Sequence, residues 1–317
     1  MTDQPPVCDY EGSDYQARFW ETGERAYEDQ TEARALRVLL PPRGRLLLEI
    51  GAGAGRNTPR YAGFERVVLF DYSRTQLEQA QARLGQSERY VYVVGDVYHL
   101  PFVPGLFDAA TLIRVIHHLA DVPAALKQIH TVLQPEAFFI LEFANKLNLK
   151  SILRWLLRRQ NWNPFDPAPL EFVPLNFDFH PGTMLHWLQM SDFQPQQIRS
   201  LSYFRLPWLK RRLPTKLLVT LDGLVQPTGQ FFQLSPSVFV RAQVRSNGPV
   251  AAPSAPSGRA SARAGDRDAP AAPGKFFRCP TCGSDDLQPT ADSLDCASCG
   301  RRWPHRDGLY DFKTPLS

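Results

Sequence analysis

The feature that most constrains this chain is the segment LLLEIGAGAGR at residues 46–56, an apolar run followed by three glycines on alternate positions. The leucine and isoleucine positions before Gly51 predict a strand that is buried on both faces, as in a parallel sheet. The glycines allow a sharp turn and leave no side chain between the backbone and a ligand. The segment therefore predicts that a nucleoside-bearing cofactor lies against the backbone.

The spacing of the glycines argues against a dinucleotide. A dinucleotide-binding turn needs G-x-G-x-x-G, whose third glycine allows close helix packing beside a pyrophosphate. That third position is Arg56 in this chain, and the glycines run G-x-G-x-G instead. Glu49, two residues before the first glycine, would repel a pyrophosphate but suits a cationic or hydroxylated ligand.

Two further carboxylates follow predicted strands, at the edge where open α/β sheets place their ligand crevice. Val67 to Phe70 is an apolar run before Asp71, about 20 residues after the glycines, the distance at which a carboxylate accepts hydrogen bonds from a ribose. Tyr90 to Val94 is a second such run, before Gly95 and Asp96. Taken singly, each aspartate is also typical of a helix N-cap or a turn. Together with the carboxylate before the glycines, they favour a nucleoside site.

The pattern E-x-G-x-G-x-G after an apolar strand resembles motif I of the class I S-adenosylmethionine (SAM) dependent methyltransferases. HLPF at 99–102 and FDAATLIRVIHHLAD at 107–121 extend the resemblance to the methyltransferase type 11 group. The resemblance implies SAM as the methyl donor, with Asp71 on the ribose hydroxyls and Asp96 on the adenine amino group. It implies cofactor contacts from Glu49, Gly51, Ala52, Gly53, Gly55, Asp71, Tyr72, Asp96, Val97 and Arg114.

The same resemblance implies a Rossmann-like α/β fold with a seven-stranded, mostly parallel sheet in the order 3-2-1-4-5-7-6, the seventh strand being antiparallel. The apolar and alternating runs can be counted onto this order as strands at 46–50, 67–70, 90–94, 107–113, 137–143, 197–203 and 236–243. Helices are predicted to start at Asp121-Val-Pro123 and to span Thr183 to Asp192. Gln134 to Ala137 stands where the family usually has a Gly-Gly turn, so the geometry of that turn is expected to differ.

Length and composition predict three regions. With 317 residues, of which 43% are hydrophobic, the chain can hold one large α/β domain and a small appendage. We assign residues 1–245 to the methyltransferase domain, with an N-terminal helical cap at about 10–40 and a lid insert at about 146–182. Residues 246–275 are mostly Ala, Pro, Gly and Ser, which predicts a disordered linker. Residues 276–317 make up the second module.

Two segments of the first region carry more specific expectations. Tyr15 to Glu32, with Phe19, Trp20 and Tyr27, resembles the helical cap that such enzymes close over the cofactor, although aromatic residues there also serve a core. In the lid, basic and apolar residues recur at helical spacing and predict a basic amphipathic helix. Its basic stripe is Lys146, Lys150, Arg154 and Arg158, and its apolar face is Leu149, Ile152, Leu153 and Leu156. Such a helix suits a plain lid, a lipophilic substrate or membrane surface, or contact with phosphates.

The second module contains Cys279, Cys282, Cys296 and Cys299 as two C-x-x-C pairs, each followed by a glycine. Four thiolates in this pattern make a closed tetrahedral Zn²⁺ site, which is structural rather than catalytic. The glycines let the backbone amides approach the sulfur atoms. Two disulfides are the alternative, and they are disfavoured in a chain without a secretory leader. A module of about 40 residues has too small a core to fold without the metal.

The tail of this module, RRWPHRDGLYDF at 301–312, resembles the small zinc-ribbon activators of tRNA, rRNA and protein methyltransferases, and the ribbon fused to some rRNA methyltransferases. The resemblance implies a contact with a partner protein or with RNA. Five basic residues suit a nucleic-acid patch, although a solvated surface explains them slightly better. They are Arg278, Arg301, Arg302, His305 and Arg306.

The remaining composition suggests a soluble cytoplasmic protein without a transmembrane segment. The N-terminal sequence MTDQPP is polar, and no run approaches the 18 or so apolar residues that span a bilayer. A formal net charge of +4 permits a partner with phosphates but does not require one.

Catalysis by such an enzyme depends mainly on positioning, because SAM already carries a sulfonium leaving group. A hydroxyl or phenol acceptor needs a base, and His117 or His118 after the fourth strand is the best placed, ahead of His180 and His186. The first hypothesis is a SAM-dependent methyltransferase acting on a small or lipophilic acceptor. The second is an RNA methyltransferase that binds its substrate through the ribbon, and the third is a catalytically inactive SAM-binding scaffold that partners other proteins.

Overall fold

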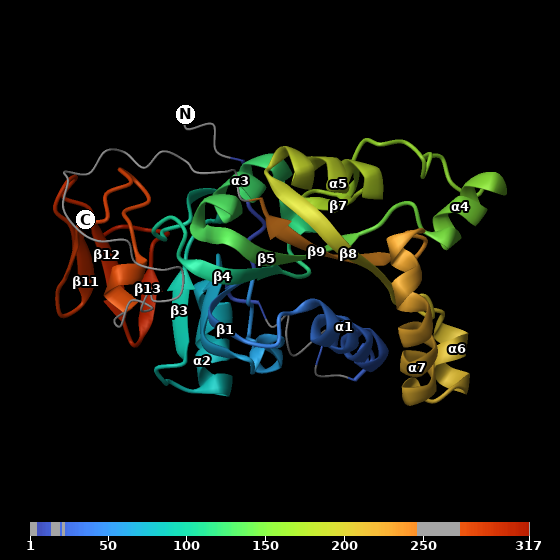
Figure 1. The fold of residues 1–317 in the computed structure, drawn as a ribbon, viewed down its shortest axis with the longest axis horizontal. Helices are drawn as coiled ribbons and strands as arrows, with labels where there is room; N and C mark the ends of the chain where they lie inside the picture. Colours follow the sequence, from blue (N-terminus) through green and yellow to red (C-terminus); the bar gives the residue numbers. More distant parts are fainter. Residues whose placement is uncertain (1–4, 14–19, 21–22, 246–272, 317) are drawn as a thin grey trace.

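The computed structural model describes residues 5–13, 20, 23–245 and 273–316, and Figure 1 shows their arrangement. Seven strands of the first region form one sheet in the order β3-β2-β1-β4-β5-β9-β8. Their bounds are β1 Gly44–Ile50, β2 Phe64–Asp71, β3 Tyr90–Val94, β4 Phe107–Leu112, β5 Leu133–Ala144, β8 Phe193–Leu201 and β9 Ser237–Val244. β9 is antiparallel to both of its neighbours, and the other pairs are parallel. The predicted order 3-2-1-4-5-7-6 is therefore confirmed.

Alternation along β1 places apolar side chains on both faces of the sheet. Leu48 packs in one core with Leu126 and Ile129 of helix α3 (Val122–Val132), whereas Leu47 packs in another with Leu77 of α2 (Arg74–Leu84). Helix α1 (Ala26–Leu39) covers the same face as α2, and α5 (Pro181–Met190) covers the same face as α3 (Figure 1). Helices on both faces explain why the strands are apolar throughout.

The helix that follows β4 begins as the sequence predicts. Asp121 is the N-cap of α3, its carboxylate accepts a hydrogen bond from the amide of Ala124, and Pro123 lies in the first turn. The segment Gln134 to Ala137, where a Gly-Gly turn is usual, lies inside β5, which begins at Leu133 rather than at the predicted residue 137. Glu136 takes a positive φ of 66°, a conformation in which glycine is normally preferred.

β8 begins earlier than predicted. It starts at Phe193 rather than Gln197 and ends at Leu201, before Ser202 turns with a φ of 65°. Pro195 lies inside β8, which is the edge strand of the sheet, where a missing backbone donor is tolerated. After it, α6 (Pro207–Arg212) and α7 (Thr215–Val225) form a helical pair that the sequence analysis did not predict.

The second module continues the central sheet instead of standing apart from it. Its strands are β10 (Leu287–Pro289), β11 (Ser293–Cys296), β12 (Arg302–Arg306) and β13 (Leu309–Asp311). β13 pairs in parallel with β3, and the amide of Phe312 donates to the carbonyl of Val94 at 2.8 Å. The module therefore covers the edge of the sheet that would otherwise expose unpaired backbone groups.

An aromatic cluster fixes the second module to the first region of the chain. Phe277 is 1% exposed and forms an isolated β-bridge with Phe102, and its ring lies 4.9 Å from that of Phe312 and 4.6 Å from that of Tyr310. Residues 246–272 of the predicted linker lie outside the described residues. The last three residues of the predicted linker belong to the turn η6 (Pro273–Phe276). Phe276 and Phe277, directly after them, are buried in the core. The predicted boundary between linker and second module was therefore too late.

The lid insert contains a shorter basic helix than predicted. Asn148 caps α4 (Leu149–Leu156), so Lys146 precedes the helix, and its ammonium group is buried against the carbonyl of Ala168. Arg158 follows the helix with a φ of 55°. Only two members of the predicted stripe therefore lie on α4. A hairpin of β6 (Leu170–Val173) and β7 (Asn176–Asp178) completes the lid.

The N-terminal cap differs from the prediction in its first part. Residues 5–13 form an extended strap without helix, and Val7 makes an isolated bridge with Leu119. Residues 14–19, which include Tyr15 at the start of the predicted segment and Phe19, lie outside the described residues. The described helix begins only at Ala26, and Tyr27 is a core residue whose hydroxyl donates to Asp222 at 2.7 Å.

Docking of the second module through Phe277 predicts a stability effect. Phe277→Ala should lower the free energy of unfolding by about 3–5 kcal/mol, because it leaves a cavity among packed aromatic rings. Urea unfolding followed by tryptophan fluorescence measures this change. Phe232→Ala, at a ring that is 66% exposed, is the matched control and should change stability by less than about 0.5 kcal/mol. Equal small effects of both substitutions would contradict the docking described above.

Candidate cofactor site and metal centre

The glycine turn after β1 takes backbone conformations that require glycine. Gly51 and Gly53 have φ values of 69° and 52°, and a Cβ atom on Gly51 would lie 2.0 Å from Cγ2 of Val115. The amides of Gly51 and Ala52 donate to the carbonyl of Phe70, at 2.8 and 3.1 Å. Space is open beside Gly53, where the nearest atom to an added Cβ would be 3.9 Å away. The turn thus presents bare backbone to a cavity.

The carboxylate of Asp71 ties the end of β2 to this turn. One oxygen accepts from the amide of Gly53 at 2.8 Å, and the other accepts from the amide of Ser73 at 2.9 Å. Burial raises the pKa of Asp71 above its usual value, although these amides act in the opposite direction. Each oxygen retains acceptor capacity beyond these bonds, as a ribose-binding carboxylate requires.

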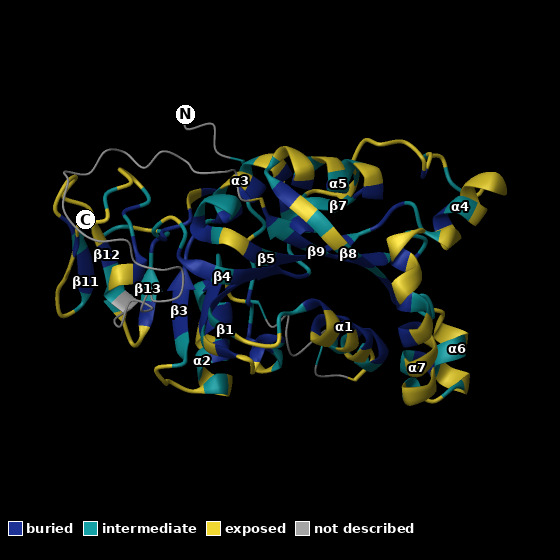
Figure 2. Cartoon of the chain, viewed as in Figure 1, coloured by how far each residue is buried: buried dark blue, intermediate teal, exposed yellow. Residues whose placement is uncertain are grey.

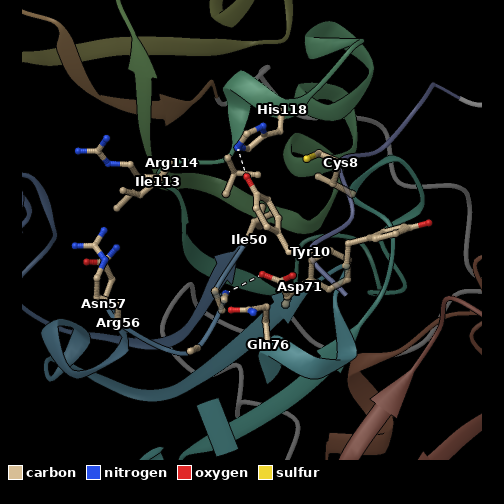
Figure 3. A pocket seen from close by; sticks show the side chains of 18 of the residues that line it. Cys8, Tyr10, Ile50, Arg56, Asn57, Asp71, Gln76, Ile113, Arg114 and His118 are labelled. Carbon is tan, nitrogen blue, oxygen red and sulfur yellow. Dashed lines mark hydrogen bonds between the residues drawn. The ribbon is translucent and has the colours of Figure 1, made fainter. Parts of the chain in front are cut away.

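A pocket of about 1010 Å³, including its open mouth, lies at the carboxyl ends of β1, β2 and β4. Figure 3 shows it between the glycine turn below and His118 above. Eight of the predicted site residues line it: Gly51, Ala52, Gly53, Asp71, Tyr72, Val97, Arg114 and His118. The sequence prediction missed several others, among them Tyr10, Trp20, Arg56, Asn57 and Gln76.

Four predicted site residues are not part of the pocket lining. Glu49 is buried beneath the turn, where the Thr58 hydroxyl donates to it at 2.6 Å, and burial raises its pKa to about 7. Asp96 accepts from the amide of Tyr98 at 2.9 Å and caps the turn η3 (Val97–His99), as its N-cap interpretation predicts. Gly55 and His117 are the other two.

A buried charge cluster beside the pocket was not predicted. Glu32 on α1 has a fully buried side chain and pairs with Arg56 at 2.8 Å and with Nε of Arg114 at 2.8 Å. Burial alone would raise the pKa of Glu32, but the two guanidinium groups outweigh it and lower that pKa to about 2. The Trp20 ring stacks on Arg56, 3.7 Å from the guanidinium carbon. Asp29 and Glu32, three residues apart on α1, were the pattern in the sequence that could have indicated this cluster.

The N-terminal strap closes one side of the pocket. Val7, Cys8 and Tyr10 line it, and Glu11 accepts from the amides of Arg74 and Thr75 at the start of α2, at 2.9 and 3.1 Å. A carboxylate at a helix N-terminus is favourable because the first amides have no partner within the helix. The predicted helical cap began at about residue 10, so it overlaps only the last residues of the strap, and Val7, Cys8 and Tyr10 were not among the predicted site residues.

His118 contacts the strap and the lid at once. Its Nδ1 lies 2.9 Å from the carbonyl of Leu175, which can only accept, so Nδ1 carries the hydrogen. In the neutral ring Nε2 is then an acceptor, and it lies 3.0 Å from the Tyr10 hydroxyl (Figure 3). Burial lowers the pKa of His118 below its usual value, which keeps the ring neutral at neutral pH.

The other candidate histidines have different surroundings. His117 lies against His118, with ring centroids 4.0 Å apart, and burial lowers its pKa well below the usual value. Its Nδ1 is buried without a hydrogen-bond partner among the described residues. His180 is the N-cap of α5 and accepts from the amide of Gly182, and His186 lies exposed on the same helix.

The four cysteines of the second module come together as predicted. All four sulfur atoms lie within 4.8 Å of one another, with Cys279 to Cys299 at 3.7 Å and Cys282 to Cys296 at 3.5 Å. Tetrahedral Zn–S bonds of 2.3 Å place sulfur atoms about 3.8 Å apart, so this donor set fits Zn²⁺. The described cysteines form no disulfide, which argues against the alternative.

The basic residues of this module are partly neutralised. Arg302 lies 3.4 Å from Asp295 and Arg306 lies 3.2 Å from Asp292. His305 stacks on Tyr310 with ring centroids 4.0 Å apart, and burial lowers its pKa. These contacts reduce the charge that the predicted nucleic-acid patch would present.

Comparison with known proteins identifies the domain. Residues 48–141 match a family model described as a methyltransferase domain. This match assigns a methyltransferase domain to residues 48–141. A solved complex between the Haloferax volcanii Trm112 methyltransferase activator and a putative methyltransferase has the same fold, with a TM-score of 0.52 and 14% identity over 73% of this chain and 96% of that one.

Curated relatives match the same region of the chain. A ubiquinone/menaquinone biosynthesis C-methyltransferase of Paracoccus denitrificans is 30% identical over 132 residues, which are 39% of this chain and 52% of the relative. An O-methyltransferase of Penicillium expansum is 31% identical over 108 residues, 32% of this chain and 39% of the relative. The chain thus spans about half, or less, of the length of these relatives.

The residues present in the pocket fit SAM. The open space beside Gly53 accepts close approach of a ligand, and Oε1 of Gln76, which lines the pocket, is buried without a hydrogen-bond partner in the described part of the chain. Asp71 keeps acceptor capacity that would suit ribose hydroxyls. Tyr72, at the rim, offers a ring on which Lys313 of the second module already packs at 4.0 Å.

The metal centre predicts a definite stoichiometry. The purified chain should contain one zinc ion, and Cys296→Ser should lose it, because a buried ligand of a four-sulfur site cannot be replaced by a hydroxyl. Plasma mass spectrometry measures the metal, and Cys8→Ser, outside the centre, is the control that should retain it. Full zinc content in the Cys296 variant would disprove this assignment.

Proposed function

We propose that the chain transfers the methyl group of SAM to a small or lipophilic acceptor that bears an ionisable hydroxyl, with His118 as the general base. The observation that carries the proposal is the Tyr10 hydroxyl, which lies inside the pocket at 3.0 Å from Nε2 of His118. A phenol thus already occupies the position that an acceptor hydroxyl needs for proton transfer.

The relatives support this class of acceptor. One is named as a C-methyltransferase of ubiquinone/menaquinone biosynthesis, and another as an O-methyltransferase. Removal of a hydroxyl proton makes the oxygen a better nucleophile, and in a phenol it also enriches the ring carbons in electron density. The same base therefore serves transfer to oxygen and to carbon.

The donor side of the pocket is assigned to the residues around the glycine turn. Bound SAM supplies an electrophilic methyl group on a positively charged sulfur, which leaves as a neutral thioether. Asp71 would hold the ribose hydroxyls, and the amides and open space at Gly51 to Gly53 would lie against the amino-acid part. Arg114, fixed by Glu32 and held at a φ of 63°, forms the wall between this turn and His118.

His118 is prepared for the proton transfer by its contacts. The Leu175 carbonyl fixes the tautomer, so Nε2 faces the pocket as an acceptor. Because burial lowers the pKa of His118, the ring is unprotonated at neutral pH and available as a base. Nε2 takes the hydroxyl proton, and the ring becomes a cation that the Leu175 carbonyl continues to hold through Nδ1–H.

Two segments meet at His118 and would exclude water from the base when both are closed. The strap brings Tyr10 to Nε2, and the lid brings Leu175 to Nδ1. The acceptor must displace Tyr10 to reach the base, so the strap is the segment that opens. Closure after binding would keep hydroxide and water away from the methyl group.

The second module supports the donor side in this proposal. Lys313 lies over the Tyr72 ring at 4.0 Å, and its ammonium group is 3.4 Å from Asp9 of the strap. Arg74 at the start of α2 lies 3.5 Å from Asp311. These contacts connect the metal module to both rims of the pocket, which favours a stabilising role within the chain.

The two alternative functions predict other results. An RNA methyltransferase would present unpaired cations on the ribbon, whereas two of its arginines pair with aspartates. A scaffold without catalysis has no need of a base with a fixed tautomer. The molecule that receives the methyl group distinguishes both alternatives from the proposal.

Incubation with methyl-labelled SAM and a cell extract, fractionated into RNA, protein and small molecules, tests the proposal. Label should enter an organic-soluble, small-molecule fraction. His118→Gln should lower the rate by roughly 10²-fold or more, the usual contribution of a general base. His186→Gln, on an exposed helix position, is the control and should leave the rate unchanged. Label confined to RNA, or no label in any fraction, would overturn the proposal.

The pH dependence of this labelling gives a second test of His118. A base must be unprotonated, so the rate should rise with pH and level off once the ring is neutral. Because the pKa of His118 is lowered, the rise should be centred below the usual value of 6.5 and the rate should be flat at neutral pH. The His118→Gln variant should lack this rise.

A further inference from the structure

Large apolar side chains are exposed on two elements that the methyltransferase fold does not require. On α4 and just after it, Leu149 and Leu153 are each 50% exposed, and Leu156 and Leu157 are each 62% exposed. No helix among the described residues is long and apolar enough to cross a membrane. The exposed leucines therefore form an apolar face on one short helix, not a membrane-spanning segment.

The second element is the helical pair and the turn that follow β8. Trp208 on α6 is 57% exposed, Leu224 on α7 is 68% exposed, and Phe231 and Phe232 after η5 (Gln226–Gln230) are 77% and 66% exposed. Exposed apolar residues clustered in this way are uncommon on a monomer and mark an interaction surface.

The two elements lie at the same end of the molecule. Figures 1 and 2 show α4, α6 and α7 together at the right-hand end of the long axis, with the metal module at the other end. The amide of Leu149 donates to the carbonyl of Leu234 at 2.9 Å, so α4 starts beside the segment that carries Phe231 and Phe232. We call these exposed residues of 149–157 and 206–232 the apolar end.

The two segments that carry the apolar end, with their flanking residues, are strongly basic. Residues 146–165 and 203–235 contain ten lysines and arginines but one acidic residue, Asp222, which is buried and accepts from Tyr27. The whole chain has a net charge of only +4. Seven of these cations are exposed and pair with no carboxylate of the described residues: Lys150, Arg154, Arg158, Arg159, Arg211, Arg212 and Lys216.

From this combination we infer that the apolar end docks on the surface of an anionic lipid bilayer. Exposed leucine, tryptophan and phenylalanine side chains enter the interfacial region, and lysine and arginine side chains beside them contact lipid phosphates. Both tryptophans of the surface, Trp155 and Trp208, suit the boundary between headgroups and acyl chains.

The charges and the apolar side chains of the apolar end disfavour two other binding partners, a second copy of the chain and a nucleic acid. A second copy of the chain would bring two equally basic surfaces together, without acidic residues at the contact to balance them. A nucleic acid would satisfy the cations, but the exposed aliphatic side chains of α4 cannot stack on bases and would stay in water. A bilayer accommodates both the apolar and the cationic groups.

The docked orientation places the lid next to the bilayer. Phe172 and Val173 of β6, in the hairpin that follows α4, are 52% and 55% exposed. The same hairpin supplies Leu175, whose carbonyl holds His118. Docking itself does not depend on methyl transfer, and it is tested without SAM or an acceptor.

Co-sedimentation of the full chain with vesicles measures the docking. The chain should bind vesicles of phosphatidylcholine mixed with phosphatidylglycerol, and only weakly those of phosphatidylcholine alone. Leu153→Glu combined with Leu156→Glu should reduce binding at least tenfold, and Arg154→Gln combined with Arg158→Gln should reduce it roughly 25-fold, at about fivefold for each cation near an anionic surface. Added salt should weaken binding of the wild-type chain.

Matched variants on other surfaces control for general effects. Val38→Glu, at a residue of α1 that is 44% exposed, controls for the leucine changes, and Arg37→Gln combined with Arg83→Gln controls for the loss of two exposed cations. Thermal unfolding checks that every variant is folded. The inference is overturned if the chain does not bind the mixed vesicles or if the control variants weaken binding as much as the test variants. It is overturned equally if ultracentrifugation shows a dimer that the Leu153 and Leu156 changes dissociate, because a second copy would then cover the surface.

Discussion

The pocket depends on one contact, in which the carboxylate at the end of β2 accepts a hydrogen bond from the amide of Gly53 in the turn after β1. This contact fixes the turn in backbone conformations that only glycine adopts easily, and it leaves the carboxylate with acceptor capacity for a ligand. Glu49 beneath the turn and the Glu32 pairs beside it hold the same loop from two further sides. A dinucleotide turn relies on a helix N-terminus instead, and this chain places Arg56 where that helix would have to pack.

Segments from both ends of the chain complete the pocket. The N-terminal strap supplies Tyr10, and the metal module supplies Lys313, which lies against Asp9 of that strap and over Tyr72 of the rim. The module reaches the rim because β13 adds to the edge of the sheet at β3, whose carboxyl end borders the cofactor site. The four-cysteine cluster is therefore connected to the pocket through one continuous sheet.

The regular part of the fold was predictable because its signals are local. β1 to β5, the helix that starts after Asp121 and the four-cysteine centre each have a short pattern of their own in the sequence. The strap, the pairing of β13 with β3 and the Tyr10–His118 contact join residues far apart in the chain, and no local pattern encodes them. Asp96 is instructive, because its expected place at a strand end is correct, but its carboxylate serves the turn that follows. The cluster of Glu32 with Arg56 and Arg114 could not be predicted, because it forms only when α1 packs beside the glycine turn.

Calorimetric titration with SAM tests the central claim, that the glycine turn held by Asp71 binds this donor. The wild-type chain should bind one SAM per chain, and Asp71→Asn should weaken the affinity roughly ten- to hundredfold, the effect of losing a hydrogen bond to a charged acceptor. Asp121→Asn, which replaces one good helix N-cap by another, should bind SAM as the wild-type chain does. Equal affinity of the Asp71 and Asp121 variants, or no binding to the wild-type chain, would contradict the account.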